Sequence, residues 1–216
     1  MKIASYGYKL VIFCFAIFFI SLLASNFYPG LLLKIITFIL GIVSIFNLYF
    51  FRDPERRVPA DKNAVLSPAD GKVVLIKDVE EPDFIQGPAK QISIFLSVFN
   101  VHVNRSPVSG KVEYYRYKEG KFIAAFNHAA SEDNEQTIIG ITSENGKVLF
   151  KQIAGLIARR IVCNLSAGDH TRQGERMGMI KYGSRVDVFV PEGTTITVKN
   201  GDTVKGGLSI LAEFSE

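Results

Sequence analysis

The sequence predicts a mainly β protein of the α+β class, in which an N-terminal hydrophobic helical hairpin precedes an antiparallel β barrel or sandwich. The first observation is that residues 1–51 contain no Asp or Glu and consist mostly of apolar side chains. The second is that residues 52–216 alternate short β-rich runs with Gly, Asn and Pro, while helix signals there are weak. We therefore expect two domains, a membrane hairpin over 1–51 and a β-rich domain over 52–216.

Two apolar runs in the N-terminal part are each suited to a membrane helix. The first run, residues 10–24, is interrupted only by Ser21, and two following aromatic residues extend it to the ~20 residues that cross a bilayer. The second run, residues 31–51, is separated from it by a turn at 25–30 that contains Pro and Gly. Together the two runs predict a helical hairpin.

The charges that flank the hairpin predict its orientation. Basic residues lie before the first run and after the second, and the turn has none: Lys2, Lys9, Arg52, Arg56 and Arg57. By the positive-inside tendency both ends face the cytoplasm, which places the β-rich domain on the cytoplasmic face of the cell (inner) membrane. A signal peptide is the alternative for the first run, but no small-residue cleavage site precedes the second. A hairpin that dips into the bilayer without crossing it would give the same topology.

Charge and cysteine content exclude several classes of function. The net charge is +4, and the β-rich part carries 22 basic and 21 acidic residues, so it lacks the basic excess of a nucleic-acid-binding domain. Cys14 and Cys163 show neither disulfide nor metal-ligand spacing. No two histidines have the close spacing of a metal motif. We expect neither nucleic acid nor a metal as a partner.

After the polar boundary at 52–59, short strands separated by turn residues are expected. An Asn-Gly pair at 145–146 is a strong hairpin signal, and Asn-Gly at 200–201 closes another run. The expected strands are 65–66, 72–76, 91–99, 111–118, 137–142, 147–153, 160–165, 178–181, 185–190 and 194–199. Such a series, without helical segments between its members, is typical of an antiparallel barrel or sandwich.

The pair Gly183-Ser184 is the first candidate for chemistry. A Gly-Ser pair usually marks an ordinary turn. Here it lies between two strand candidates, 178–181 and 185–190, so flanking structure would hold the serine while its own peptide bond can be strained.

Asp70 and the three histidines are the other candidates. Asp70 precedes Gly71 and has the alternative of simple turn chemistry. His102 lies in an alternating segment and shares a face with polar neighbours, although a structural histidine is the competing interpretation. His128 and His170 are rival bases, and the adjacent Asp169 does not form a dyad with His170, because neighbours in a strand point to opposite faces.

Four stretches together resemble the short bacterial phosphatidylserine decarboxylases. They are Pro68–Gly71, Val98–Pro107, Gln152–Arg160 and Gly174–Phe189, and the likeness covers nearly the whole chain, including the apolar hairpin. Each stretch is a weak motif alone, but four in this order are specific.

The resemblance implies a proenzyme that makes its own prosthetic group. The Ser184 hydroxyl attacks the Gly183 carbonyl, and elimination then releases an α chain, 184–216, whose first residue becomes a covalent pyruvoyl group. Residues 1–183 remain as the membrane-attached β chain, and the two chains form a heterodimer that could dimerise further. Glycine leaves the attacked carbonyl unhindered and tolerates a strained backbone.

The implied reaction is the decarboxylation of phosphatidylserine to phosphatidylethanolamine and CO₂ by a pyruvoyl-dependent carboxy-lyase. The pyruvoyl carbonyl forms a Schiff base with the substrate amine and accepts electrons as the carboxylate leaves. His102 is the implied base of self-cleavage, oriented by Asp70 in a serine, histidine, carboxylate relay. A lipid substrate also gives the membrane hairpin a purpose.

The chain departs from the larger members of the family at two places. Phe99 occupies the position of a second histidine, so a reused His102, His128 and water all stay open as the source of the proton returned to the substrate carbon. The larger members have Leu-Gly-Ser-Thr where this chain has Tyr-Gly-Ser-Arg. Arg185 and Arg160 are candidates for binding a substrate carboxylate or phosphate, with a structural role as the alternative.

Two other classes of function compete with this one. Ser67–Val74 and Gly201–Leu211 resemble the half-motifs of lipoyl or biotinyl carrier folds, as a membrane-anchored adaptor or carrier module without catalysis would have. No lysine-bearing attachment hairpin accompanies them, so they more readily describe how the β domain closes. A hydrolase using Ser184 lacks the Gly-x-Ser-x-Gly elbow.

Overall fold

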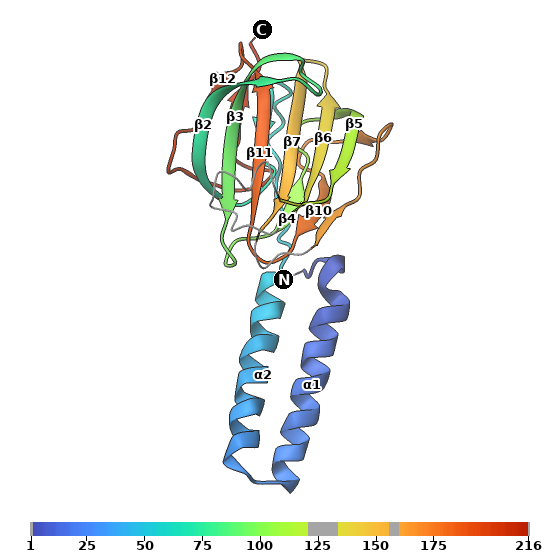
Figure 1. Cartoon of the computed structure of the whole chain (residues 1–216), viewed down its shortest axis with the longest axis vertical. Helices are drawn as coiled ribbons and strands as arrows, with labels where there is room; N and C mark the ends of the chain where they lie inside the picture. The colour runs from blue at the N-terminus through green and yellow to red at the C-terminus, as the bar shows by residue number, and fades with distance from the viewer. Residues whose placement is uncertain (1, 121–133, 156–159, 216) are drawn as a thin grey trace. The chain divides into compact units, whose positions relative to one another are not determined.

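The structure, a computed structural model, describes residues 2–120, 134–155 and 160–215 in two compact units, 1–55 and 56–216 (Figure 1). The first unit is the expected helical hairpin. A short 3₁₀ turn, Ser5–Gly7, leads into α1 (Tyr8–Phe27), and α2 (Leu31–Phe50) returns antiparallel to it.

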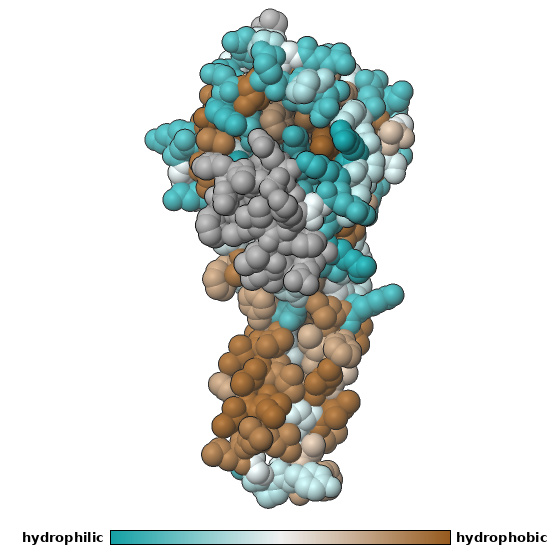
Figure 2. Space-filling view, in the orientation of Figure 1, coloured by the Kyte–Doolittle hydropathy of each residue, from teal (hydrophilic) through white to brown (hydrophobic). Residues whose placement is uncertain are grey.

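Burial in the hairpin is the reverse of that in a water-soluble protein. Four of the six buried residues of α1 and α2 are polar, namely Ser21, Thr37, Ser44 and Asn47, and Ser21 Oγ lies 2.6 Å from Thr37 Oγ1. Ser44 is also buried, and its hydroxyl donates to the Leu40 carbonyl at 2.8 Å. Large apolar side chains cover the outside, which Figure 2 shows as a nearly continuous hydrophobic surface. Small polar residues inside and apolar residues outside are the arrangement expected for helices packed in lipid.

The second unit is built on an eight-stranded antiparallel sheet with the order β13-β2-β3-β11-β7-β6-β5-β9 (Figure 1). In chain order its strands are β2 (Gly71–Glu81), β3 (Gly87–Leu96), β5 (Gly110–Lys118), β6 (Gln136–Thr142), β7 (Lys147–Ala154), β9 (His170–Thr171), β11 (Ser184–Pro191) and β13 (Thr203–Val204). The centre of the sheet is β11, which pairs β3 on one side and β7 on the other.

Two three-stranded sheets complete the unit, with the orders β1-β14-β12 and β4-β10-β8. Their strands are β1 (Ala64–Leu66), β4 (Val103–Arg105), β8 (Ile161–Cys163), β10 (Arg176–Ile180), β12 (Thr195–Ile196) and β14 (Ile210–Glu213). Because β13 pairs with the start of β2, at Thr203↔Lys72 and Val204↔Gly71, the two stretches with carrier-like composition lie side by side. The fold is therefore mainly β, and a helical hairpin precedes it in the chain, as the sequence predicts.

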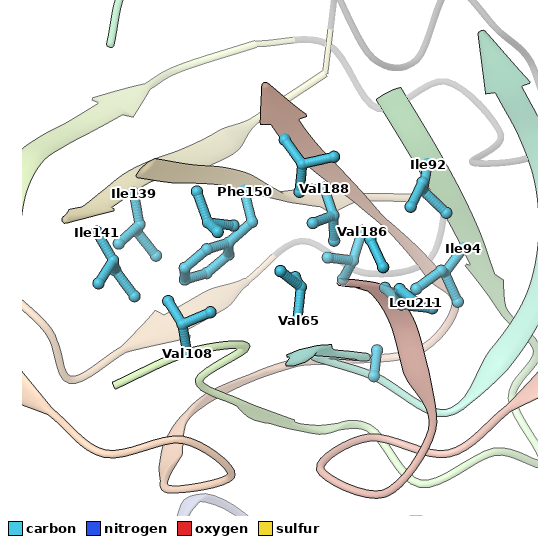
Figure 3. Packing of buried hydrophobic residues seen from close by; sticks show 14 of the residues in the cluster. Val65, Ile92, Ile94, Val108, Ile139, Ile141, Phe150, Val186, Val188 and Leu211 are labelled. Carbon is cyan, nitrogen blue, oxygen red and sulfur yellow. The ribbon is translucent and has the colours of Figure 1, made fainter. Parts of the chain in front are cut away.

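One face of the large sheet carries the main hydrophobic core. Alternate residues of β11 point into it, and they pack with branched aliphatic side chains from β3, β6 and β7 (Figure 3). The labelled members in Figure 3 include Ile92, Ile94, Ile139, Phe150, Val186 and Val188. We call this the inner face of the sheet. It is the face onto which the first residue of β11, Ser184, directs its side chain.

The other face, here called the outer face, carries a smaller cluster and several polar residues. Phe84, from the connection between β2 and β3, covers Ile138, Leu149 and Phe189. Farther along β11 on the same face lie Arg185 and Asp187, both buried. The core strand of the domain therefore has an apolar inner face and a partly polar outer face.

The structure corrects one sequence-based boundary that matters for the site. The strand expected over 91–99 ends at Leu96, and residues 97–102 form turns before β4 begins at Val103. The alternating pattern through His102 is therefore not a strand pattern. The turn is held instead by Asn100, whose side-chain oxygen accepts from the Ser97 amide at 2.9 Å and from the Ser97 hydroxyl at 2.8 Å.

Candidate active site

The connection between β10 and β11 holds Tyr182 and Gly183 in left-handed backbone conformations. β10 ends at Ile180 and β11 begins at Ser184, and the two residues before that serine have positive φ, +58° for Tyr182 and +80° for Gly183. A left-handed tyrosine costs roughly 1–2 kcal/mol, whereas glycine adopts this conformation without penalty. Open space surrounds the position of a Cβ on Gly183, so the backbone angle rather than crowding explains the glycine. The Gly183-Ser184 peptide thus follows two consecutive residues in left-handed conformations, one of which, Tyr182, bears a steric cost.

Ser184 combines complete burial with an unused hydroxyl. It pairs with Leu96 on β3 and with Ala154 on β7, and its side chain shares the inner face with Val186. Its Oγ is buried and has no hydrogen-bond partner among the described residues. A buried hydroxyl without a partner costs about 1–3 kcal/mol, so this position is not chosen for stability.

His102 is the histidine that the structure brings to the glycine. It is fully buried, and its Nδ1 lies 3.0 Å from the Asn100 carbonyl oxygen, which can only accept. Nδ1 therefore carries the proton, and the unprotonated Nε2 faces the peptide, accepting a long hydrogen bond of 3.4 Å from the Gly183 amide. A neutral imidazole with its acceptor nitrogen turned toward this peptide has the state that a general base requires.

Asp70 is held by partners other than His102. The Arg56 guanidinium donates two hydrogen bonds to its carboxylate, of 2.5 and 2.8 Å, and the Gly206 amide donates a third at 2.8 Å. The turn that contains Asp70 does reach toward the site, because the Pro68 carbonyl accepts the Arg105 amide at 2.9 Å, three residues after His102. The sequence did not predict Arg56 as the partner of Asp70, because the two lie 14 positions apart and no recognisable motif links them.

A polar pair on the inner face was also missed as a site feature. Gln152 on β7 and Asn104 on β4 are both fully buried, and Gln152 Nε2 donates to Asn104 Oδ1 at 2.9 Å. Gln152 pairs with Val186. It lies two residues along β7 from Ala154, which is the partner of Ser184. A glutamine between core positions is the one signal by which the sequence could have indicated it.

Arg185 lies on the opposite face of β11 from Ser184. It is 1% exposed, its Nε donates to Asp187 at 2.7 Å and its Nη2 donates to Ser93 at 2.6 Å. Asp187 accepts a further hydrogen bond of 2.9 Å from Gln91. In the conformation described, this network occupies the arginine on the outer face.

Arg160 and Lys181 bring positive charge close to the Gly183-Ser184 peptide. Arg160 is exposed immediately before β8, and its carbonyl accepts the Lys181 amide at 3.3 Å. Partial burial lowers the pKa of Lys181 from its ordinary value, and the Arg160 charge lowers it further. The effect of Arg160 shows that the two cations lie close enough to repel each other. The Cys163 thiol is different, because burial raises its pKa and makes it a poor nucleophile.

The remaining candidates lie away from this cluster or outside the described residues. His170 is exposed on β9 and lines a surface pocket of about 620 Å³ that contains neither His102 nor Ser184. His128 lies outside the described residues. Phe99 is 65% exposed in the turn before His102. Within the described ranges, no group of three or more His, Cys, Asp or Glu is arranged to hold a metal ion.

The comparisons with known proteins agree on one family. The family model for phosphatidylserine decarboxylase matches residues 43–212. The chain is similar to the phosphatidylserine decarboxylase proenzyme of Desulfotalea psychrophila, at 50% identity over 84% of this chain and 85% of the relative. It is similar to that of Chlorobaculum tepidum at 46% identity over 99% and 98% of the two chains. It is also 49% identical to that of Wolbachia pipientis wMel over 78% and 75% of the two chains. The chain therefore belongs to the phosphatidylserine decarboxylase family.

Proposed function

We propose that this chain is the precursor of an enzyme that decarboxylates phosphatidylserine to phosphatidylethanolamine, and that it cuts itself between Gly183 and Ser184. The observation that carries the proposal is the state of this one peptide. The preceding glycine is held at φ +80°, the following serine hydroxyl is buried without a described partner, and His102 presents an acceptor nitrogen to the glycine amide. An unhindered carbonyl, a nucleophile and a base next to one bond are the components of an acyl transfer.

Self-cleavage follows from these three components. Ser184 Oγ adds to the Gly183 carbonyl carbon while His102 Nε2 accepts the hydroxyl proton, and the same proton then passes to the departing Ser184 nitrogen as the peptide bond breaks. The product is an ester between Gly183 and the serine oxygen. Loss of the Ser184 α-proton breaks the bond from Cβ to the ester oxygen, so residues 1–183 leave with a C-terminal carboxylate. Addition of water and loss of ammonia convert the remaining residue into a pyruvoyl group at the start of chain 184–216.

The residues present fit such a group. Ser184 directs its side chain onto the buried inner face, where it is excluded from water, and its paired neighbours on β3 and β7 would hold the new N-terminus in the sheet after the cut. When formed, the pyruvoyl group supplies a carbonyl that binds the substrate amine and accepts the electrons released with CO₂. The two chains stay together as a heterodimer because β11 remains between β3 and β7.

Asp70 supports His102 through the turn that it stabilises. Its pairing with Arg56 and Gly206 fixes the Pro68–Gly71 turn, and the Pro68 carbonyl in turn fixes the backbone of Arg105 just after the histidine. Removing the carboxylate would loosen the segment that positions His102. This is a less direct role than the hydrogen bond to the imidazole that the family resemblance implies.

The substrate is a lipid, and two features of the chain suit it. The hairpin, with apolar residues outside and hydroxyls inside, would hold the enzyme in the cell membrane with the β domain on the cytoplasmic side. Arg160 and Lys181 place positive charge beside the cut, where the phosphate or carboxylate of the headgroup would arrive. Arg185 would have to leave Asp187 to take part, and we assign it a structural role.

The direct test is a decarboxylation assay with detergent-solubilised full-length protein. We expect release of CO₂ and formation of phosphatidylethanolamine from phosphatidylserine, and no CO₂ from soluble serine, because the lipid is the expected substrate. A parallel assay with archaetidylserine, which has the same serine headgroup on a different lipid, tests whether the enzyme recognises the headgroup alone or also the lipid part. A chain that is fully cut but releases no CO₂ from either lipid would contradict the assigned reaction. An uncut, inactive chain would favour a membrane-anchored adaptor.

A further inference from the structure

Two fully buried polar groups on the inner face lack partners, and they are complementary. The Ser184 hydroxyl is a donor, the Gln152 side-chain oxygen Oε1 is an acceptor, and neither is hydrogen-bonded to any described residue. Most buried polar atoms in folded proteins have partners, so two exceptions close together need an explanation. The two residues lie on adjacent strands and on the same face.

The strand register places the two side chains within reach of each other. Ser184 pairs with Ala154 on β7, while Gln152 pairs with Val186, so Ser184 and Gln152 are diagonal neighbours. Diagonal neighbours on one face of a sheet have Cα atoms about 7–8 Å apart, a gap that a long side chain can span. No charged side chain pairs with either residue at these two positions.

The orientation of the Gln152 amide is fixed by a chain of hydrogen bonds. Asn104 Nδ2 makes a long contact of 3.5 Å with the Pro68 carbonyl, which can only accept, and this assignment leaves the Asn104 oxygen for Gln152. Gln152 Nε2 donates to that oxygen at 2.9 Å. The amide therefore cannot turn round without losing this bond, and Oε1 is the atom left for another donor.

We propose that Gln152 is a positioning residue for self-cleavage, whose Oε1 accepts the Ser184 hydroxyl and holds Oγ on the inner face until His102 takes the proton. The inference rests on the proposed cut between Gly183 and Ser184. The proposed contact would connect the Pro68–Gly71 turn to the Ser184 hydroxyl through Asn104 and Gln152. The turn would then help to orient the nucleophile, in addition to the role proposed for Asp70. The hydroxyl proton passes to His102 as Oγ attacks, so Gln152 binds the hydrogen but does not remove it.

The test is a double-mutant cycle on the rate at which freshly made full-length chain is cut. Gln152→Met keeps the side-chain volume but removes the acceptor, and we expect cleavage about tenfold slower, the effect of losing one buried hydrogen bond. Ser184→Cys replaces the hydroxyl by a thiol, a much weaker donor, and hydroxylamine releases the resulting thioester for measurement. In that background we expect Gln152→Met to change the rate less than about twofold.

The cycle separates a specific role from general damage to the core. If Gln152 only stabilised the sheet, its replacement would slow the serine and cysteine chains equally, and that result would overturn the proposal. Gln136→Met is the matched control, because this buried glutamine lies on β6 with its side chain on the outer face, and we expect wild-type cleavage.

A shorter amide covers the case in which Gln152→Met is insoluble. Gln152→Asn keeps an amide but places it one methylene short of spanning from Asn104 to Ser184, so the same tenfold and twofold effects are expected in the two backgrounds. Wild-type cleavage in either Gln152 variant would overturn the proposal and leave the proposed cut intact. A wild-type chain that is never cut between Gly183 and Ser184 would instead overturn the proposed function itself.

Discussion

Ser184 and Arg185 are neighbours on β11, yet their side chains meet opposite conditions on the two faces of the sheet. On the outer face, Arg185 is bound to Asp187 and Ser93, and Gln91 completes the network. On the inner face, the Ser184 hydroxyl is equally buried but has no described partner. Burial is the same on both sides, but Arg185 leaves only its Nη1 without a described partner, whereas the Ser184 hydroxyl has none at all.

The difference separates a group that stabilises the fold from one that reacts. A buried charge must be paired, because an unpaired one costs several kcal/mol, and the outer face meets this demand for Arg185 with Asp187. A serine that is consumed during maturation gains nothing from a charged partner, which would hinder its attack, whereas the neutral acceptor proposed at Gln152 would only orient the hydroxyl. The left-handed backbone of Tyr182 and Gly183, which immediately precedes Ser184, is a second feature that does not serve stability.

The largest expected effect comes from removing the nucleophile. Ser184→Ala should abolish cleavage and decarboxylation, because no oxygen remains to attack the Gly183 carbonyl. Gel electrophoresis should show only the intact chain, while Ser166→Ala, at an exposed serine, should be cut as the wild type is. Cutting of the Ser184→Ala chain at this bond would contradict serine as the nucleophile.

Loss of the base should come next. His102→Gln removes the imidazole that faces the Gly183 amide, and we expect cleavage slower by roughly 10²- to 10⁴-fold, the usual contribution of a general base. The measurement is the fraction of chain cut with time after synthesis. His170→Gln is the control at an exposed histidine, and equal rates for both variants would remove His102 from the mechanism.

The pair of Asp70 and Arg56 tests how far the inner-face chemistry depends on supporting contacts. Asp70→Asn and Arg56→Met each break a buried ion pair, and each should lower the free energy of unfolding by about 3–5 kcal/mol. Urea unfolding in the Ser184→Ala background compares chains that are all uncut. If Asp70 acts through the turn, both variants slow cleavage to a similar degree. Arrest by Asp70→Asn alone would instead show that the carboxylate acts on His102 directly.

The smallest effect on cleavage is expected from the outer face. Asp187→Asn leaves Arg185 buried without its counter-charge and should lower the free energy of unfolding by about 3 kcal/mol, measured in the same Ser184→Ala background. Cleavage of the otherwise wild-type chain should slow by less than about threefold, because the inner face is unchanged. Slower cleavage without loss of stability would show that the outer face takes part in cleavage and does not serve stability alone.

The sequence predicted the elements of the fold more fully than the contacts of the site. Periodicity and composition identified the helical hairpin and the strands near 111–118, 137–142, 147–153 and 185–190, because each has a local pattern. The end of β3 at Leu96 was missed, because residues 97–103 continue the alternating pattern while Asn100 makes turn contacts with Ser97. Local pattern does not reveal such a side-chain bond.

The site residues came from family resemblance, and the structure adds what resemblance does not contain. It brings His102 to Gly183 across 81 residues, and it pairs Asp70 with Arg56. It also places Arg185 on the face opposite Ser184, which alternation along a strand could have predicted once Ser184 was known to face inward. The orientation of Gln152 depends on Asn104 and Pro68, both distant in sequence, so no local pattern predicts it.

The most direct test of the proposed self-cleavage is the mass of the purified wild-type protein. Mass spectrometry should show two chains, residues 1–183 and residues 184–216, the second with its N-terminus blocked and with the mass of a pyruvoyl group in place of serine. Sequential degradation should fail on that chain until the block is removed. A single intact chain of 24.0 kDa in a preparation that decarboxylates phosphatidylserine would contradict the account.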